Sequence, residues 1–180
     1  ATSGNLRMVD HYFLGPSLVR GFAPSGIGPR DVLNDPTANA VGGTTYFGGT
    51  VEVQFPIFGL PRDLGLRGAV FADAGTLFNY DGGSKSVAYA CPAGSEARQY
   101  NVITGGAQSN IGCIRDKNVL RSSVGVSLLW QSPLGPIRFD YAYALSKDDG
   151  QFGTDPVTGL TGKFGGDRVQ AFRFSGGARF

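Results

Sequence analysis

The chain alternates between apolar and polar residues along five stretches, which is the pattern of β-strands with one apolar face. The clearest stretch is 120–130, where Val124, Val126 and Leu128 point one way while Ser123, Gly125 and Ser127 point the other. The other predicted strands are 44–57, 64–78, 137–145 and 169–180. Each is about as long as a tilted strand must be to cross a lipid bilayer.

The connections between these stretches alternate between short and long. Residues 59–61 and 132–136 contain proline and glycine and predict tight turns. The connections 79–118 and 146–166 are predicted to be long polar loops without regular structure, which would be unusual in a compact soluble domain. Short turns at one end and long loops at the other indicate an all-β, antiparallel up-and-down meander.

Alternation alone does not separate a soluble β-sandwich, whose apolar faces meet in a core, from a barrel, whose apolar face contacts lipid. The polar faces of the predicted strands carry the charged residues Glu52, Arg67, Asp73, Arg121, Arg138 and Asp140. So many charged residues are not expected in the dry core of a soluble protein, but they suit the interior of a water-filled barrel. The pattern therefore favours a transmembrane β-barrel.

The composition agrees with this interpretation. The 180 residues include 29 glycines, and 12% are aromatic while 17% are charged, which suits an all-β protein with many turns. No apolar run is long enough for a transmembrane helix. The net charge of +2 comes with no basic cluster interleaved with aromatic residues, so we expect no nucleic-acid partner. The chain begins at Ala1 without a methionine or signal segment, and we expect a mature or excised piece.

The sequence offers little for catalysis. It holds one histidine, His11, and neither a Gly-x-Ser-x-Gly motif nor a phosphate-binding loop, so we expect no enzyme and no cofactor. Asp155 and Asp167 are interpreted as solvated loop carboxylates. The spacing of the possible ligands also predicts no metal site.

Two cysteines, Cys91 and Cys113, lie in the polar loop between the second and third predicted strands. In an oxidising compartment we expect them to form a disulfide that closes part of this loop. The alternative is two unrelated thiols.

The stretch 14–30 is too apolar and too rich in glycine for an ordinary solvated loop. It places Arg20 between Val19 and the pair Gly21-Phe22, which suggests a tight backbone turn beside a packed ring. An arginine fixed in this way needs a carboxylate partner elsewhere in the chain.

Several groups of residues resemble the signatures of one known family, the BamA-type outer-membrane assembly factors of the bacterial surface antigen family. They are Val19-Arg20-Gly21-Phe22 with Ile27-Gly28-Pro29, the F-x-D-x-G pattern of 71–75, the run from Trp130 to Arg138, and a last strand that ends on an aromatic residue. The motifs occur in the family's order, from about residue 12 to residue 180.

The resemblance implies a single partial domain, 1–180: the carboxyl-terminal portion of a transmembrane β-barrel in the bacterial outer membrane. Residues 1–43 would form an arginine loop that folds into the barrel, and 44–180 the last strands. The family inserts and folds other outer-membrane β-barrel proteins without ATP. The implied partners are the lipid bilayer, unfolded client proteins and accessory lipoproteins. The alternatives are a two-partner secretion transporter, a passive porin-like barrel and a soluble β-sandwich binding module.

The alternation within each predicted strand assigns its residues to one of two faces. Together with the family's motifs, this assignment predicts the partners of Arg20. We expect Arg20 to pair with Asp73 first and with Glu52 second, with Asp140 as a reserve acceptor. The resemblance also assigns the loop-docking motif to Val19, Arg20, Gly21 and Phe22, and a carboxyl-terminal strand signal to Phe172, Phe174 and Phe180.

Overall fold

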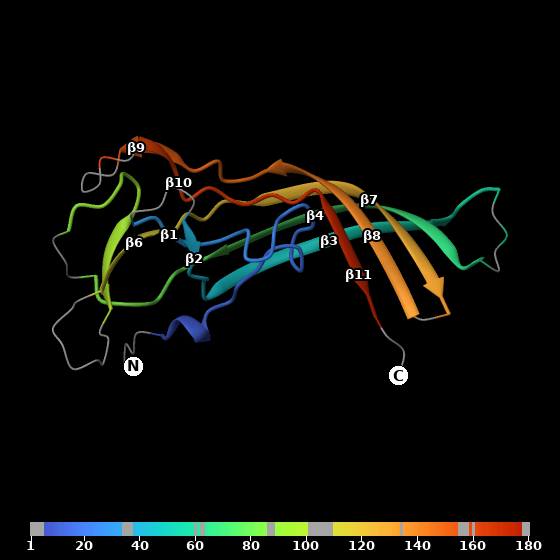
Figure 1. Ribbon diagram of the computed structural model, residues 1–180, viewed down its shortest axis with the longest axis horizontal. Helices are drawn as coiled ribbons and strands as arrows, with labels where there is room; N and C mark the ends of the chain where they lie inside the picture. Colours follow the sequence, from blue (N-terminus) through green and yellow to red (C-terminus); the bar gives the residue numbers. More distant parts are fainter. Residues whose placement is uncertain are drawn as a thin grey trace.

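The computed structural model describes residues 6–33, 38–59, 61, 64–85, 89–100, 110–133, 135–154, 159 and 161–177. Long strands run side by side along the molecule, the long loops gather at one end, and the short turns lie at the other (Figure 1). Within the described ranges, no helix is long and apolar enough to cross a membrane.

Five antiparallel strands form the main sheet, in the order β11-β8-β7-β4-β3. Their bounds are Thr45–Pro56 (β3), Leu66–Phe78 (β4), Arg121–Ser132 (β7), Gly135–Ser146 (β8) and Phe172–Gly176 (β11). The long strands are neighbours in the sheet in the order in which they follow along the chain. The predicted antiparallel meander is therefore confirmed (Figure 1).

One face of this sheet is apolar on every strand. The strand register aligns one apolar residue from each strand in a row: Val53, Val70, Val126, Tyr141 and Phe172. All five are exposed, from 45% for Val70 to 60% for Tyr141. The predicted apolar faces are thus correct.

The opposite face is polar and is covered over part of its length, while Arg67 at the start of β4 stays exposed. Asp73 on β4 and Asp140 on β8 are each only 3% exposed. A soluble sandwich would bury its apolar faces against one another, whereas this sheet exposes the apolar face and covers the charged one. That is the arrangement of a transmembrane β-barrel wall, which excludes the β-sandwich alternative.

Short strands occur where the sequence predicted unstructured loops. A small sheet has the order β2-β1-β6-β5, and β9 pairs with β10 in a separate hairpin. The bounds are Arg30–Asp31 (β1), Asn39–Ala40 (β2), Glu96–Tyr100 (β5), Asn110–Arg115 (β6), Gln151–Thr154 (β9) and Thr161–Phe164 (β10). The prediction of structureless loops at 79–118 and 146–166 was therefore wrong.

Near the ends of the described chain, the structure has one short helix and a last strand that begins later than predicted. A 3-10 helix spans Met8–Asp10, and Tyr12 makes one isolated bridge to Gly43. The strand β11 is shorter than the predicted 169–180, because its ladder with β8 begins at Phe172. Phe180, assigned to the carboxyl-terminal signal, lies outside the described residues.

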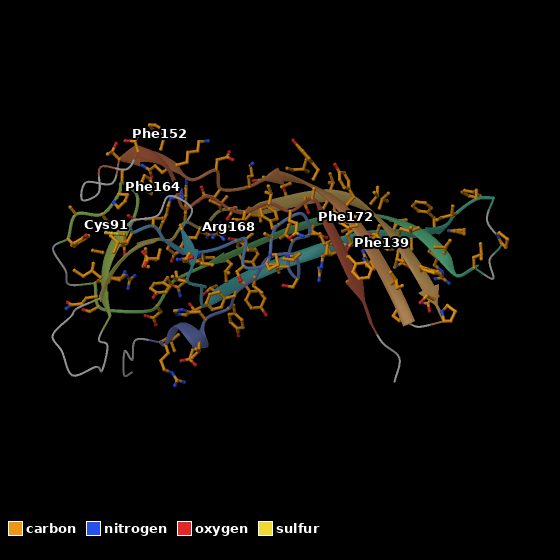
Figure 2. The ribbon with its side chains drawn as sticks, in the orientation of Figure 1. Cys91, Phe139, Phe152, Phe164, Arg168 and Phe172 are labelled. Carbon is orange, nitrogen blue, oxygen red and sulfur yellow. A yellow bond between two sulfur atoms is a disulfide. The ribbon has the colours of Figure 1, made fainter. Side chains whose placement is uncertain are left out.

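The long loops pack together into a cap at their end of the sheet. Its apolar cluster joins Val32, Ala38, Cys113 and Phe164, which come from three different connections. The predicted disulfide is confirmed, since Cys91 and Cys113 are bonded. Figure 2 shows Cys91 and Phe164 at this end, with Phe139 and Phe172 on the main sheet.

Candidate functional site: the docked arginine loop

The segment 14–30 lies against the polar face of the main sheet and is held there by apolar packing. Val19, Phe22 and Ile27 form a fully buried cluster with Leu77 of β4. Burial of this size stabilises by roughly 1.5–3 kcal/mol per large side chain. The four residues therefore fix the loop against the wall before any charge is considered.

Glycine is required at the tip of the loop. Gly21 has φ of +92°, a conformation that residues with a side chain rarely adopt. A Cβ atom at this position would lie 3.2 Å from the Cβ of Ala142 on β8. Gly21 thus allows the backbone to turn directly against the wall, which aims the neighbouring Arg20 along it.

Arg20 forms a bidentate ion pair with Asp73. Its Nε donates to Oδ2 and its Nη2 donates to Oδ1, both at 2.7 Å, and its backbone N–H donates to Oδ2 at 3.0 Å. Arg20 is 9% exposed, so the pair is shielded from water. A planar guanidinium suits two parallel bonds to one carboxylate, and this geometry adds direction as well as energy.

Two further groups complete the environment of this guanidinium. Arg20 Nη1 donates to Glu52 Oε2 at 2.6 Å, and the guanidinium carbon lies 3.5 Å from the centre of the Phe71 ring. Such stacking attracts a cation to the ring face. The structure therefore places Arg20 against both predicted carboxylates and on an aromatic platform that the sequence did not reveal.

Small residues make room for that platform. Gly125 on β7 pairs with Phe71, and a Cβ atom at Gly125 would lie 2.5 Å from Phe71 Cζ. The missing side chain lets the ring lean across β7. Gly125 was placed on this face by its alternation, but nothing in the sequence indicated what the gap accommodates.

A second arginine joins the site from β8. Arg138 Nη2 donates to Glu52 Oε2 at 2.7 Å, and its Nε donates to Asp140 at 2.6 Å. Ser127 donates its hydroxyl to the same Asp140 carboxylate. Asp140 was predicted as a reserve acceptor for Arg20, but in the structure it accepts hydrogen bonds from Arg138 and Ser127 instead. Glu52 is thus shared by two arginines.

The loop environment changes the pKa of its charged groups. Burial alone would lower the pKa of Arg20, but hydrogen bonds to Asp73 and Glu52 outweigh this and raise it above the ordinary value. In the cap, burial lowers the pKa of Arg30 and raises the pKa of Asp31. Arg20 therefore stays charged at any physiological pH.

Two more buried ion pairs fix the long loops, and one of them, Arg121–Asp167, connects a loop to the wall. Arg121 donates to Asp167 at 2.9 Å, and Arg115 donates to Asp148 at 2.9 Å. The backbone N–H of Asp148 also donates to Asp167. The expectation of a solvated Asp167 was wrong, because its side chain is 1% exposed. Asp155, the other such carboxylate, lies outside the described residues.

The fold and the site define a class of protein: a transmembrane β-barrel wall with an arginine loop pinned to its inner face. The comparison with protein families agrees, because the model of the Omp85 superfamily domain matches residues 1–180. The chain belongs to this superfamily, and it is accordingly a protein of the bacterial outer membrane.

Two curated relatives are each named outer membrane protein assembly factor BamA. The relative from Neorickettsia risticii (strain Illinois) is 36% identical over 143 residues, which is 79% of this chain and 15% of the relative. The relative from Neisseria meningitidis serogroup B is 31% identical over 141 residues, 77% of this chain and 16% of the relative. The chain thus matches only a small part of the length of these proteins.

Proposed function

We propose that this chain serves in an outer-membrane assembly factor that folds β-barrel proteins and inserts them into the bacterial outer membrane. Unfolded β-barrel clients and accessory lipoproteins are the proposed partners. The observation that carries the proposal is the arginine loop, pinned through Arg20 to Asp73 and Glu52. Relatives named as assembly factors support the same function.

A passive porin-like barrel would need no such loop. An arginine shared between two carboxylates and stacked on a ring fills the space in front of the wall instead of lining an open channel. The loop's apolar cluster with Leu77 adds to this obstruction. Both features favour a protein whose interior holds a fixed element.

The cap favours assembly over polypeptide export. Strand β1 of the arginine loop pairs with β6, and Phe164 of the last long loop packs on Val32 and Cys113. With the disulfide, these contacts join three loops at the long-loop end of the sheet. In a transmembrane barrel the long loops face the outside of the cell, where a secreted chain would leave. We infer that clients enter the membrane sideways and do not pass through the cap.

Reconstitution of the full-length protein in lipid vesicles tests the proposal. The protein is added to an unfolded outer-membrane β-barrel protein, and folding is followed by the electrophoretic mobility of the folded barrel. We expect faster folding than in empty vesicles, and Arg20→Ala should abolish most of the gain. Arg67→Ala is the matched control, because Arg67 is an exposed arginine on the same wall.

The two main competing functions give different results in this assay. A secretion transporter would carry an unfolded polypeptide across the vesicle membrane and leave the rate of barrel folding unchanged. A passive barrel would change neither quantity. Either result contradicts the proposed function.

A further inference from the structure

The last strand of the sheet and the residues directly before it have different backbone hydrogen-bonding partners. From Phe172 to Gly176 it pairs with β8, and the N–H of Ala142 on β8 donates to the carbonyl of Ala171 at 2.8 Å. The preceding residues, 168–170, pair instead with the arginine loop. The residues directly before β11 are therefore hydrogen-bonded to the loop and not to the barrel wall.

Three backbone hydrogen bonds make this second ladder. Gln170 N–H donates to Gly21 O at 3.0 Å, and Arg168 N–H donates to Gly26 O at 2.9 Å. In the other direction, Ala23 N–H donates to Arg168 O at 2.8 Å. An antiparallel bridge between Phe22 and Val169 lies among them.

Two arginine side chains extend the contact to both limbs of the loop. Arg173, on β11, donates to the carbonyl of Pro16 at 2.8 Å, just before the tip. Arg168 donates to the carbonyl of Ala38 at 2.9 Å, on the returning limb. Figure 2 shows Arg168 between the cap and the main sheet.

The contact is too close to be incidental. A Cβ atom at Gly26 would lie 2.5 Å from the carbonyl oxygen of Arg168. Gly26 thus permits the loop backbone to approach 168–170 at hydrogen-bonding distance. A larger residue would push the two segments apart.

We propose that the arginine loop holds residues 168–170 in place through its backbone hydrogen bonds, and that Arg173 is a positioning residue that holds the last strand on the loop tip. Docking of the loop and placement of the last strand are then one event. When the loop leaves the wall, residues 168–170 lose their partner while 172–176 remain paired with β8. This inference deepens the proposed function, on which it rests, because β11 is an edge of the main sheet.

Another anchor could hold the same residues without the loop. Asp167 forms a buried ion pair with Arg121 of β7, directly before the segment. If that pair alone fixes the segment, undocking the loop changes nothing at 168–170. The two possibilities therefore differ in a measurable quantity.

Amide hydrogen exchange of the full-length protein in lipid nanodiscs separates them. In Arg20→Ala, the amides of Arg168 and Gln170 should exchange at least about tenfold faster, since their acceptors are loop carbonyls. The amides of 172–176 should exchange at the rate of the unaltered protein. Arg67→Ala should leave both segments unchanged. Faster exchange at 18–23 together with unchanged exchange at 168 and 170 would overturn the proposal.

A second variant tests Arg173 without touching the ion pair of Arg20. Arg173→Ala should accelerate exchange at 168–170, and Arg173→Lys should restore most of the protection, because a lysine can still donate to Pro16 O. Equal exchange in Arg173→Ala and the unaltered protein would remove Arg173 from the positioning role. The exchange assay does not depend on client folding, so a failure of the proposed function is seen separately in the vesicle assay.

Discussion

At the scale of single residues, the site depends on close packing as much as on charge. Arg20 reaches Asp73 only because Gly21 turns against Ala142, and it stacks on Phe71 only because Gly125 leaves room for the ring. Strand phases indicated that Arg20's acceptors face inward. They gave no indication that Arg138 shares Glu52, because alternation assigns a face and not the reach of a side chain.

Gly125→Ala tests the packing of the platform. The added methyl group would meet Phe71 Cζ at 2.5 Å and would lie closer still to the backbone carbonyl oxygen of Tyr141 on β8, so we expect both the ring and β8 to shift and the free energy of unfolding to fall by about 1–3 kcal/mol. Thermal unfolding of the full-length protein measures this change. Gly49→Ala on β3 is the control, since a Cβ atom there meets nothing within 4 Å. An equal loss in both variants would show that neither the ring nor β8 needs the gap at Gly125.

At the scale of elements, the long strands were predictable and the cap was not. Alternation over 44–57, 64–78, 120–130 and 137–145 identifies β3, β4, β7 and β8 from local sequence alone, and the observed bounds differ from these by at most two residues at either end. Strand β1 has two residues and pairs with β6, so that Arg30 lies opposite Arg115. A ladder between residues so distant in sequence leaves no local periodicity. The Arg121–Asp167 ion pair also joins residues that are distant in sequence, so no local pattern predicts it.

Removal of the disulfide should loosen the cap and spare the sheet. Replacing both Cys91 and Cys113 by serine frees a loop closed over a separation of 22 residues, which is worth roughly 3 kcal/mol in the chain-entropy model. Hydrogen exchange in β6 should therefore accelerate, while exchange in β4 stays constant. Faster exchange throughout the main sheet would contradict the division into wall and cap.

At the scale of the whole molecule, the two faces of the sheet determine its orientation in the membrane: the apolar face contacts lipid and the polar face lines the barrel interior. Val70 and Arg67 lie on the same strand with opposite parity, one on the apolar face and one on the polar face. With single cysteines in the membrane-embedded protein, Arg67→Cys should react with a water-soluble thiol reagent and Val70→Cys should not. Equal reaction at both positions would contradict a barrel wall.

The central claim is that the arginine loop is pinned through Arg20 and that assembly depends on this contact. A double-mutant cycle between Arg20→Ala and Asp73→Asn in the full-length protein tests it most directly. Breaking a buried ion pair by removing one partner costs about 3–5 kcal/mol. The second substitution should then add little, so the coupling energy in unfolding should be about as large as the cost of one substitution, roughly 3 kcal/mol, with a matching non-additive loss of client folding. Strictly additive effects, with a coupling energy indistinguishable from zero, would contradict the account.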